Sequence, residues 1–539
     1  MNKKTVFFLL FFICISSFFL IIFINRSINY WGDEIFSLTT ANKNSLDIVK
    51  IHLYDRHPPL HSLLLHYWII IFGKSIFSLR FFSSIFILLS IPLLFFFTKL
   101  FTSTKKSLIS AFLFSISPLI LLWGRMNRYY SFTLFLSLIS NYFYFLILTK
   151  KTLNFKRLFY YLLSLILLLL SHYSYFLTIA STQLLLYFFI NKKKILNTLK
   201  NNKQILTIFL FFCTLTIVLL FGFLFITKNS FIVGRFSLIS SIRVLLGFIF
   251  FIEQSLVGLG VSLWNPFALL GFFAFIISFI TPIKYLIKKK FNINNPLTWL
   301  FFYLVISFFS NLILFSVLKY LGSYVFPAKI LYLFPILLVF VISKQKTRKL
   351  TFFIFLILIL CNFIGHATYF KLGSEKNTGV FDWRTIVPNK NIKIFIEKYE
   401  QTYKIKNSVI IFDKGYIIPF LYYGPLNESV LDINISLMEK TGTFLSEYYM
   451  YGKKQKIYQN IDEYISTKNL SKYVWLIFSD RTRDQKLVST NLEERNYTLN
   501  FCKGYLEDSN YNLFFLEKLY NKKLKSHSLY SCLYLKENI

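Results

Sequence analysis

Two neighbouring carboxylates, Asp33 and Glu34, follow an aromatic pair just after the first long apolar segment. Acids are scarce in this part of the chain: residues 1–370 contain five, against 35 lysines and arginines, and four of the five lie between residues 26 and 76. A carboxylate placed here could act as a general base that deprotonates a hydroxyl group. Adjacent carboxylates also raise each other's pKa, which suits a base or a metal ligand. The alternative is that this is simply a solvated loop rich in polar residues.

Cationic side chains form a second set with chemical potential. Arg125 and Arg128 stand in the run Arg-Met-Asn-Arg-Tyr-Tyr, in which Tyr129 follows the second arginine. A guanidinium group binds phosphate oxygens in a fork, so the pair predicts a phosphate or pyrophosphate site, and Tyr129 beside it is a candidate for substrate binding. Lys329, at the start of a later apolar segment, could meet the same phosphate. The alternative for each cation is a side chain that snorkels from the membrane edge to water.

Histidines complete the set of candidates. His57 precedes Pro58-Pro59, and His61 follows them. A spacing of four residues can bind metal on a helix, but prolines between the two histidines break that helix, so we predict no metal site there. His57 is instead expected to line the acceptor site. His172 lies between two apolar segments and is a further candidate for substrate binding, although a lone histidine at a membrane edge usually has no such role.

The elements that must position these residues are membrane helices. Aromatic residues make up 20% of the chain and its mean hydropathy is +0.55, values typical of a multi-pass membrane protein. The net charge of +36 could suggest nucleic acid, but lysine and arginine occur in short runs between apolar segments, as topology signals do. We therefore expect membrane lipids and no nucleic acid as partners. Eleven spans are predicted, near residues 5–25, 77–98, 107–123, 129–149, 156–171, 173–190, 205–227, 266–283, 297–318, 327–343 and 350–367.

The basic runs also predict the orientation of the chain. With eleven spans, the basic runs around Lys99–Lys106 and Lys284–Lys290 are cytoplasmic, and the N-terminus is inside. The acids of residues 26–76, the two arginines, His172 and Lys329 then share the outer face. Residues 241–261 are apolar enough to span but would reverse this pattern, so we expect a re-entrant or surface helix on the outer side.

Two regions outside the spans have their own predicted structure. In the outer loop 26–76, residues 45–54 and 60–72 are expected to form surface helices separated by the two prolines. Residues 371–539 carry 19 acids and 25 basic residues, and they contain short β-type runs at 409–412, 473–478 and 512–516 and a probable helix at 391–403. These features predict a small α/β domain outside the membrane. Cys502 and Cys532 could form a disulfide there, but no connectivity follows from the sequence.

These motifs, in this order, resemble the GT-C membrane glycosyltransferases, most closely the protein O-mannosyltransferase and aminoarabinose transferase-like proteins of bacteria. The resemblance rests on Asp-Glu after the first span, Arg-His-Pro-Pro-Leu, Arg-x-x-Arg-Tyr and His-Tyr, and it covers residues 1–370. It implies a GT-C transmembrane catalytic domain that takes a sugar from a polyprenyl-phosphate carrier, with Asp33 acting at the acceptor. Arg80, in Leu-Arg-Phe, matches a common position of that family. Lys329 departs from the arginine that many relatives have, and a lysine lacks the bidentate fork.

The sequence therefore predicts an α-helical multi-pass GT-C protein with a C-terminal extracytoplasmic α/β domain, in the cell (plasma) membrane. Its predicted activity is inverting transfer of a sugar from polyprenyl phosphate to a hydroxyl group of a lipid, glycan or protein. No cofactor is required by the motifs, although a divalent metal is possible at Asp33 and Glu34. The alternatives are a flippase for lipid-linked sugars, which would need acids or broken helices at mid-membrane, and a non-catalytic scaffold, in which Asp33 would be dispensable.

Overall fold

The computed structural model describes residues 2–25, 32–54, 57–150, 154–191, 238–258, 261, 265–317, 327–345 and 349–372, and the segments 409–412, 430–431, 473–479, 496–504 and 529–536. The chain divides into two compact units. The first unit consists of residues 1–26 and 41–370, and the second of residues 27–40 and 371–539. The predicted span 205–227, the helix 391–403 and the strand 512–516 lie outside the described residues, as does Asp55.

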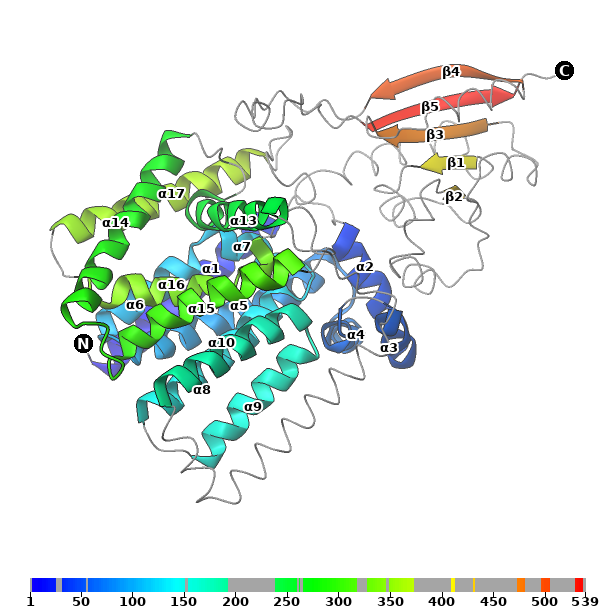
Figure 1. The fold of residues 1–539 in the computed structure, drawn as a ribbon. Coiled ribbons are helices and arrows are strands. Elements are labelled where there is room, and N and C mark those ends of the chain that lie inside the picture. The colour runs from blue at the N-terminus through cyan, green and yellow to red at the C-terminus, as the bar shows by residue number, and fades with distance from the viewer. Residues whose placement is uncertain are drawn as a thin grey trace. The chain divides into compact units, whose positions relative to one another are not determined.

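The first unit is a bundle of apolar helices (Figure 1). Among the described residues, six helices are long and apolar enough to cross a membrane. Side chains such as Phe8, Phe19 and Ile71 are more than 60% exposed on the surface of the unit, as expected where lipid is the solvent. The chain is therefore a multi-pass membrane protein. The six helices are α1 (Lys3–Asn25), α5 (Ile76–Lys99), α8 (Tyr130–Lys150), α10 (Tyr173–Asn191), α14 (Pro266–Lys288) and α15 (Pro296–Val317).

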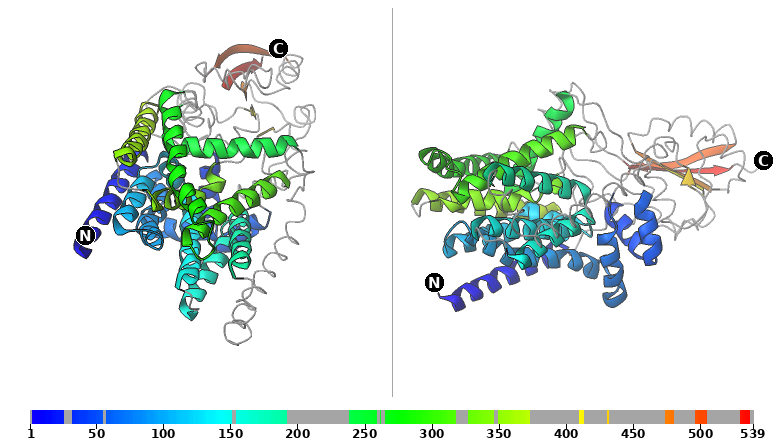
Figure 2. Two further views of the ribbon diagram at one scale, coloured as in Figure 1. Left: turned by 60° about the vertical axis from the view of Figure 1, so that its left-hand side comes forward. Right: turned by 60° about the horizontal axis from the view of Figure 1, so that its bottom comes forward.

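Three further predicted spans, near residues 156–171, 327–343 and 350–367, each contain a helix, and these three helices differ from one another in length. Helix α9 (Phe155–Leu169) has 15 residues and α16 (Leu333–Ser343) has 11, which at 1.5 Å per residue is less than the thickness of a bilayer core. Helix α17 (Lys349–Leu372) has 24 residues. The views in Figure 2 show that α8, α9 and α10 run side by side, as their mutual contacts require.

The predicted third span, 107–123, is not one straight helix. It is divided into α6 (Thr104–Ser115) and α7 (Pro118–Arg125), which meet at an angle of 55°. Pro118 causes the break, because its ring disfavours a helical conformation for the residue before it. Ser117 is accordingly extended, with φ −64° and ψ 124°. If the bent pair is counted as one crossing, the described residues contain seven candidate spans.

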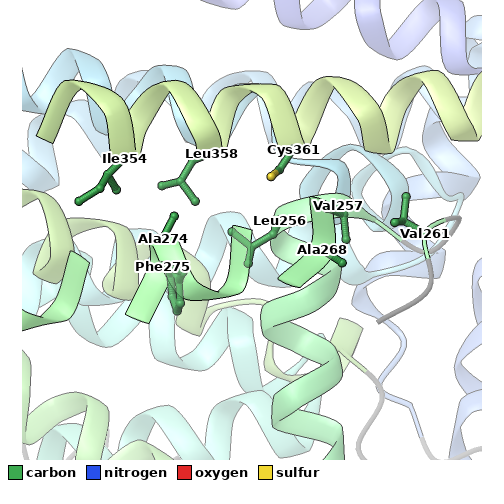
Figure 3. Close-up of a cluster of buried hydrophobic side chains, with 9 residues drawn as sticks. All are labelled: Leu256, Val257, Val261, Ala268, Ala274, Phe275, Ile354, Leu358 and Cys361. Atoms are coloured by element: carbon green, nitrogen blue, oxygen red, sulfur yellow. The ribbon is translucent and has the colours of Figure 1, made fainter. Parts of the chain in front are cut away.

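Helix α13 (Leu238–Val257) occupies the segment that we expected to be re-entrant or superficial. It packs against α7, α14, α15 and the short 3-10 helix η2 (Pro327–Ile330). Figure 3 shows the apolar core at its C-terminal end, where Leu256 and Val257 meet Ala274 and Phe275 of α14 and Cys361 of α17. Close approach depends on Gly365, because a Cβ there would overlap the backbone carbonyl of Val257. This packing fixes α13 against the helix that ends at Arg125.

The outer-loop helices have the predicted bounds. Helix α3 (Ser45–Tyr54) and helix α4 (Leu60–Phe72) are separated by the two prolines, and Pro59 is the N-cap residue of α4. Figure 1 shows both helices at one end of the bundle, with α4 seen nearly end-on. Leu46 of α3 and Ile70 and Ile71 of α4 are exposed apolar residues, as expected for helices at the membrane surface.

The described part of the second unit contains helix α2 (Gly32–Ala41) and a five-stranded mixed sheet. The strands are β1 (Val409–Phe412), β2 (Val430–Leu431), β3 (Tyr473–Ser479), β4 (Tyr497–Gly504) and β5 (Leu529–Lys536), in the order β2-β1-β3-β5-β4. β1 is parallel to β2 and β3, whereas β5 is antiparallel to β3 and β4. β1 and β3 coincide with predicted strands; β2, β4 and β5 were not predicted.

Candidate functional site

The turn between α7 and α8 carries the predicted arginine pair. Arg125 is the last residue of α7, and the backbone then turns through Met126, whose carbonyl accepts a hydrogen bond from the N–H of Arg128 at 2.6 Å. Arg125 and Arg128 are 1% and 7% exposed. Two buried guanidinium groups cost free energy unless anionic or polar groups surround them, so neither arginine is a side chain snorkelling to water.

Three rings from different elements meet beside this turn. The ring centroid of Tyr129 lies 4.8 Å from that of His57 and 4.5 Å from that of His172, and the two histidine rings are 5.3 Å apart. The guanidinium carbon of Arg128 lies 5.2 Å from the Tyr129 ring centroid, a cation–π distance. The structure thus brings together three residues predicted to bind substrate and one predicted to bind phosphate. We call His57, Arg128, Tyr129 and His172 the outer cluster.

His172 presents an unused hydrogen-bond donor to this cluster. Its Nδ1 lies 2.9 Å from the Ser174 hydroxyl and 3.5 Å from the backbone N–H of Tyr175, which can only donate. The neutral imidazole therefore carries its proton on Nε2. That atom is fully buried and has no hydrogen-bond partner among the described residues. A buried donor without a partner is rare in folded proteins, and a ligand atom or a water molecule can satisfy it.

The charge around His172 is positive. Burial lowers the pKa of His172 well below its ordinary value of 6.5, and His57, Lys329 and Arg128 lower it further. Lys329 lies in η2 and is half-buried. η2 is tied to the cluster because the Tyr175 hydroxyl donates to the Ala328 carbonyl. A neutral histidine donor in the positive field of Arg128 and Lys329 is an arrangement that favours an anion.

Backbone and side-chain hydrogen bonds hold His57 in this position. The N–H of Leu60 donates to the carbonyl of Leu170 at 3.2 Å, which joins the Pro58-Pro59 segment to the turn between α9 and α10. His52 of α3 bonds the carbonyl of His57 through Nδ1 and the hydroxyl of Ser62 through Nε2, both at 2.8 Å. His52 was not singled out in the sequence, because its spacing resembles that of any residue on the buried face of a helix.

His61 is a second residue whose place the sequence did not reveal. It is buried in α4, and its Nε2 has no hydrogen-bond partner among the described residues. Burial lowers its pKa to about 3, with further contributions from Arg128 and His52. His61 is therefore neutral and close to the positive charge of the outer cluster.

The remaining predicted residues are placed as follows. The backbone of Asp33 and Glu34 lies in the first turn of α2, where acids are favoured by the helix dipole. Glu34 is 2% exposed, whereas the side chain of Asp33 lies outside the described residues. Arg80 is fully buried near the start of α5. Asp33 and Glu34 belong to the second unit and Arg80 to the first, and the roles of all three stay predictions.

A metal site was left open by the sequence. Within the part of the chain that is described, no three histidine, cysteine or acidic side chains are grouped as metal ligands. The Asp33 side chain and Asp55 are outside that part, and a divalent metal at Asp33 and Glu34 stays a prediction.

The helical fold is that of the GT-C membrane glycosyltransferases, which confirms the predicted fold class. Residues 56–221, which include all four residues of the outer cluster, match the family model for dolichyl-phosphate-mannose-protein mannosyltransferases. These findings agree with the resemblance drawn from the sequence and support a GT-C membrane glycosyltransferase.

Solved structures show what the chain is similar to. ArnT from Cupriavidus metallidurans in the apo state is 11% identical, with a TM-score of 0.56 over 98% of each chain. The same protein bound to undecaprenyl phosphate is 9% identical, with a TM-score of 0.54 over 98% of each chain. The archaeal oligosaccharyltransferase AglB from Archaeoglobus fulgidus is 12% identical, covers 94% of this chain and 74% of its own, and has a TM-score of 0.46. No curated protein sequence matches the chain.

Proposed function

We propose that this protein transfers a sugar from a polyprenyl-phosphate carrier to an acceptor hydroxyl, with the outer cluster as the site of the carrier phosphate. The single observation that carries the proposal is the buried Nε2–H of His172, which has no hydrogen-bond partner among the described residues and lies in the positive field of Arg128 and Lys329. A phosphate oxygen would accept this hydrogen bond and would be neutralised by the two cations. The match over residues 56–221 and the likeness to a structure bound to undecaprenyl phosphate support the same ligand class.

The chemistry follows from the charge of the leaving group. In the transfer, the bond from the anomeric carbon to the phosphate oxygen breaks while a bond to the acceptor oxygen forms on the opposite face. Negative charge accumulates on the departing phosphate, where Arg128, Lys329 and the His172 donor stabilise it. Arg125, buried at the end of α7, is assigned to the same phosphate. No general acid is needed, because phosphate leaves as an anion.

Asp33 is assigned the opposite role at the acceptor. Its carboxylate takes the proton of the attacking hydroxyl, and Glu34 tunes it or shares a divalent metal with it. Tyr129 and His57 line the sugar or acceptor side of the cluster, where their rings offer stacking surfaces. Arg80 is retained as a further contact to the carrier phosphate. The acceptor is a lipid, a glycan or a protein.

The compartment is inferred from the predicted topology. Basic runs on the inner side place the outer cluster and residues 371–539 on the extracytoplasmic face of the plasma membrane. A reporter enzyme fused after residue 380 should be active only outside the cytoplasm. Activity in the cytoplasm would mean that the chain crosses the membrane an even number of times instead of the predicted odd number.

The experiment that tests the function uses membranes that contain the full-length protein and radiolabelled polyprenyl-phosphate sugars. Label should pass to an acceptor fraction, and the His172→Ala variant, which removes the unused donor, should transfer it more slowly with weaker donor binding. His66→Ala is the control, since it removes a histidine of α4 that bonds the backbone carbonyl of Ala41 outside the outer cluster. Movement of intact carrier-linked sugar across the bilayer, without transfer, would identify a flippase instead.

A further inference from the structure

Two cysteines of the second unit face each other across a strand pair. β4 and β5 are antiparallel, and their register pairs Cys502 directly with Cys532. Cys502 and Cys532 are separated by 30 positions, and the sequence alone did not determine whether they pair. The strand register, which the sequence does not encode in any local motif, brings their backbones opposite each other.

This register satisfies the geometric requirement for a disulfide. Residues directly opposite in an antiparallel pair have Cα atoms about 4.5–5.5 Å apart, and their Cβ atoms leave the sheet on the same face. Disulfides join Cα atoms about 4.4–6.8 Å apart, so no backbone movement is needed. A register shift between Leu499 and Phe501 precedes this pair, and without that shift Cys532 would lie opposite a different residue.

The neighbouring strand defines the environment of the pair. β5 lies between β3 and β4, and Cys532 is also paired with Leu476 on β3. The row across the sheet is therefore Leu476, Cys532 and Cys502. The next rows on the same face contain Val474, Tyr534 and Leu499 on one side, and Phe478, Tyr530 and Gly504 on the other. The row that contains the two cysteines thus lies between rows composed mainly of apolar and aromatic residues.

We infer that Cys502 and Cys532 form an intramolecular disulfide that joins β4 to β5. The two thiols lose two protons and two electrons, which are taken up by the disulfide of a thiol–disulfide oxidant: one cysteine thiolate attacks it, and the second resolves the mixed disulfide. The products are the cross-strand bond and a dithiol on the oxidant. Such a bond persists in an oxidising compartment, which agrees with the extracytoplasmic placement proposed for residues 371–539.

Thiol counting on the full-length protein tests this. Membranes are quenched in acid, denatured in detergent and treated with maleimide-PEG, so that each free thiol adds one step of apparent mass. The chain has five cysteines: Cys14 and Cys361 are free, and Cys213, in the predicted span 205–227, is expected to be free as well. We expect three steps without reductant and five after reduction. Five steps without reductant would overturn the inference.

Single variants identify the pair. Cys502→Ser and Cys532→Ser should each give four steps with or without reductant, because each frees the other cysteine. Cys361→Ser is the matched control and should give two steps without reductant and four with it. A disulfide-linked dimer that disappears in Cys502→Ser would show an intermolecular bond and would also refute the pairing. These outcomes do not depend on transferase activity, so they are distinguishable from failure of the proposed function.

Discussion

The Nδ1 of His52 lies 2.8 Å from the backbone carbonyl oxygen of His57, and its Nε2 lies 2.8 Å from the Ser62 hydroxyl. A carbonyl cannot donate, so Nδ1 carries the proton and the Ser62 hydroxyl donates to Nε2. One buried imidazole therefore joins α3, the Pro58-Pro59 segment and α4. It fixes the residue that stacks on Tyr129 and His172.

The His52→Ala variant is expected to weaken donor binding at the outer cluster without removing any residue of the cluster. Losing one side of a buried hydrogen bond costs about 1–3 kcal/mol, and here the cost falls on the position of His57. Donor KM should rise more than kcat falls, because His52 acts on binding geometry. Steady-state kinetics with a labelled polyprenyl-phosphate sugar measure both constants.

His52→Asn is the rescue variant, since its amide can still donate to the His57 carbonyl. His66→Ala is the matched control: His66 also bonds a backbone carbonyl, that of Ala41, but outside the cluster. If His52→Ala and His66→Ala have equal effects on donor KM, His52 has a general structural role only.

Arg128→Ala should weaken donor binding at least about tenfold, because a charge-assisted hydrogen bond to phosphate contributes about 1.5–3 kcal/mol. Arg128→Lys keeps the charge but loses the fork and the flat contact with Tyr129, so it should recover only part of the affinity. Titration of the carrier lipid against purified protein gives the dissociation constant. Lys156→Ala, at an exposed position of α9, is the control for general loss of positive charge. A change restricted to acceptor affinity would assign Arg128 to the acceptor.

Asp33→Asn should lower the transfer rate by at least about 100-fold, since general-base assistance contributes roughly 10²–10⁴. Donor binding and protein level should persist, because the change removes charge and keeps size. Asp47→Asn is the control from the same loop; Asp47 accepts a hydrogen bond from Asn44 at the start of α3. Added EDTA then separates a metal-free base from a metal ligand shared with Glu34. Wild-type transfer by Asp33→Asn would refute the proposed mechanism.

Acid should destabilise the first unit through its buried histidines. The pKa of His61 is about 3 in the folded protein, against an ordinary value of 6.5. Below pH 6.5 the His61 side chain therefore becomes protonated in the unfolded chain but stays neutral in the folded chain. The free energy of unfolding falls as the pH falls through this window. The melting temperature in detergent should drop between pH ~7 and ~5, and less in His61→Gln, which cannot titrate. Identical pH slopes for both proteins would contradict the assignment.

Gly365→Ala should destabilise the contact between α17 and α13. The added Cβ would overlap the Val257 carbonyl oxygen, a backbone atom that cannot rotate away. A penalty of about 1–3 kcal/mol is expected, as for overpacking in a core. At Gly271 an added Cβ meets the Cys361 sulfur at 2.9 Å, and this side-chain atom is easier to displace, so Gly271→Ala should be milder. Thermal unfolding of both variants checks the order.

The sequence allowed prediction where local chemistry dictates structure. Pro58-Pro59 separates two short apolar segments, and α3 and α4 end and begin as expected. The histidine and arginine turns share one face because apolar length and basic runs determine topology. The bend at Ser117 was missed although Pro118 signals it, because the apolar run continues through the break. The places of His52 and His61 and the pairing of Cys502 with Cys532 depend on contacts between segments that are distant in the sequence. No local sequence pattern predicts such contacts.

The broken third span also has a mechanical consequence. Where α6 ends, the carbonyl of Ile116 accepts a hydrogen bond from Nε2 of His366 in α17, at 2.7 Å. The His366 side chain of α17 therefore bonds the bend after which α7 begins, and α7 ends at Arg125. If binding of the proposed carrier phosphate moves α7 about this bend, it also changes the hydrogen bond between His366 and Ile116. Linkage then requires that loss of this bond change carrier affinity by the same free energy with which the carrier changes the bond.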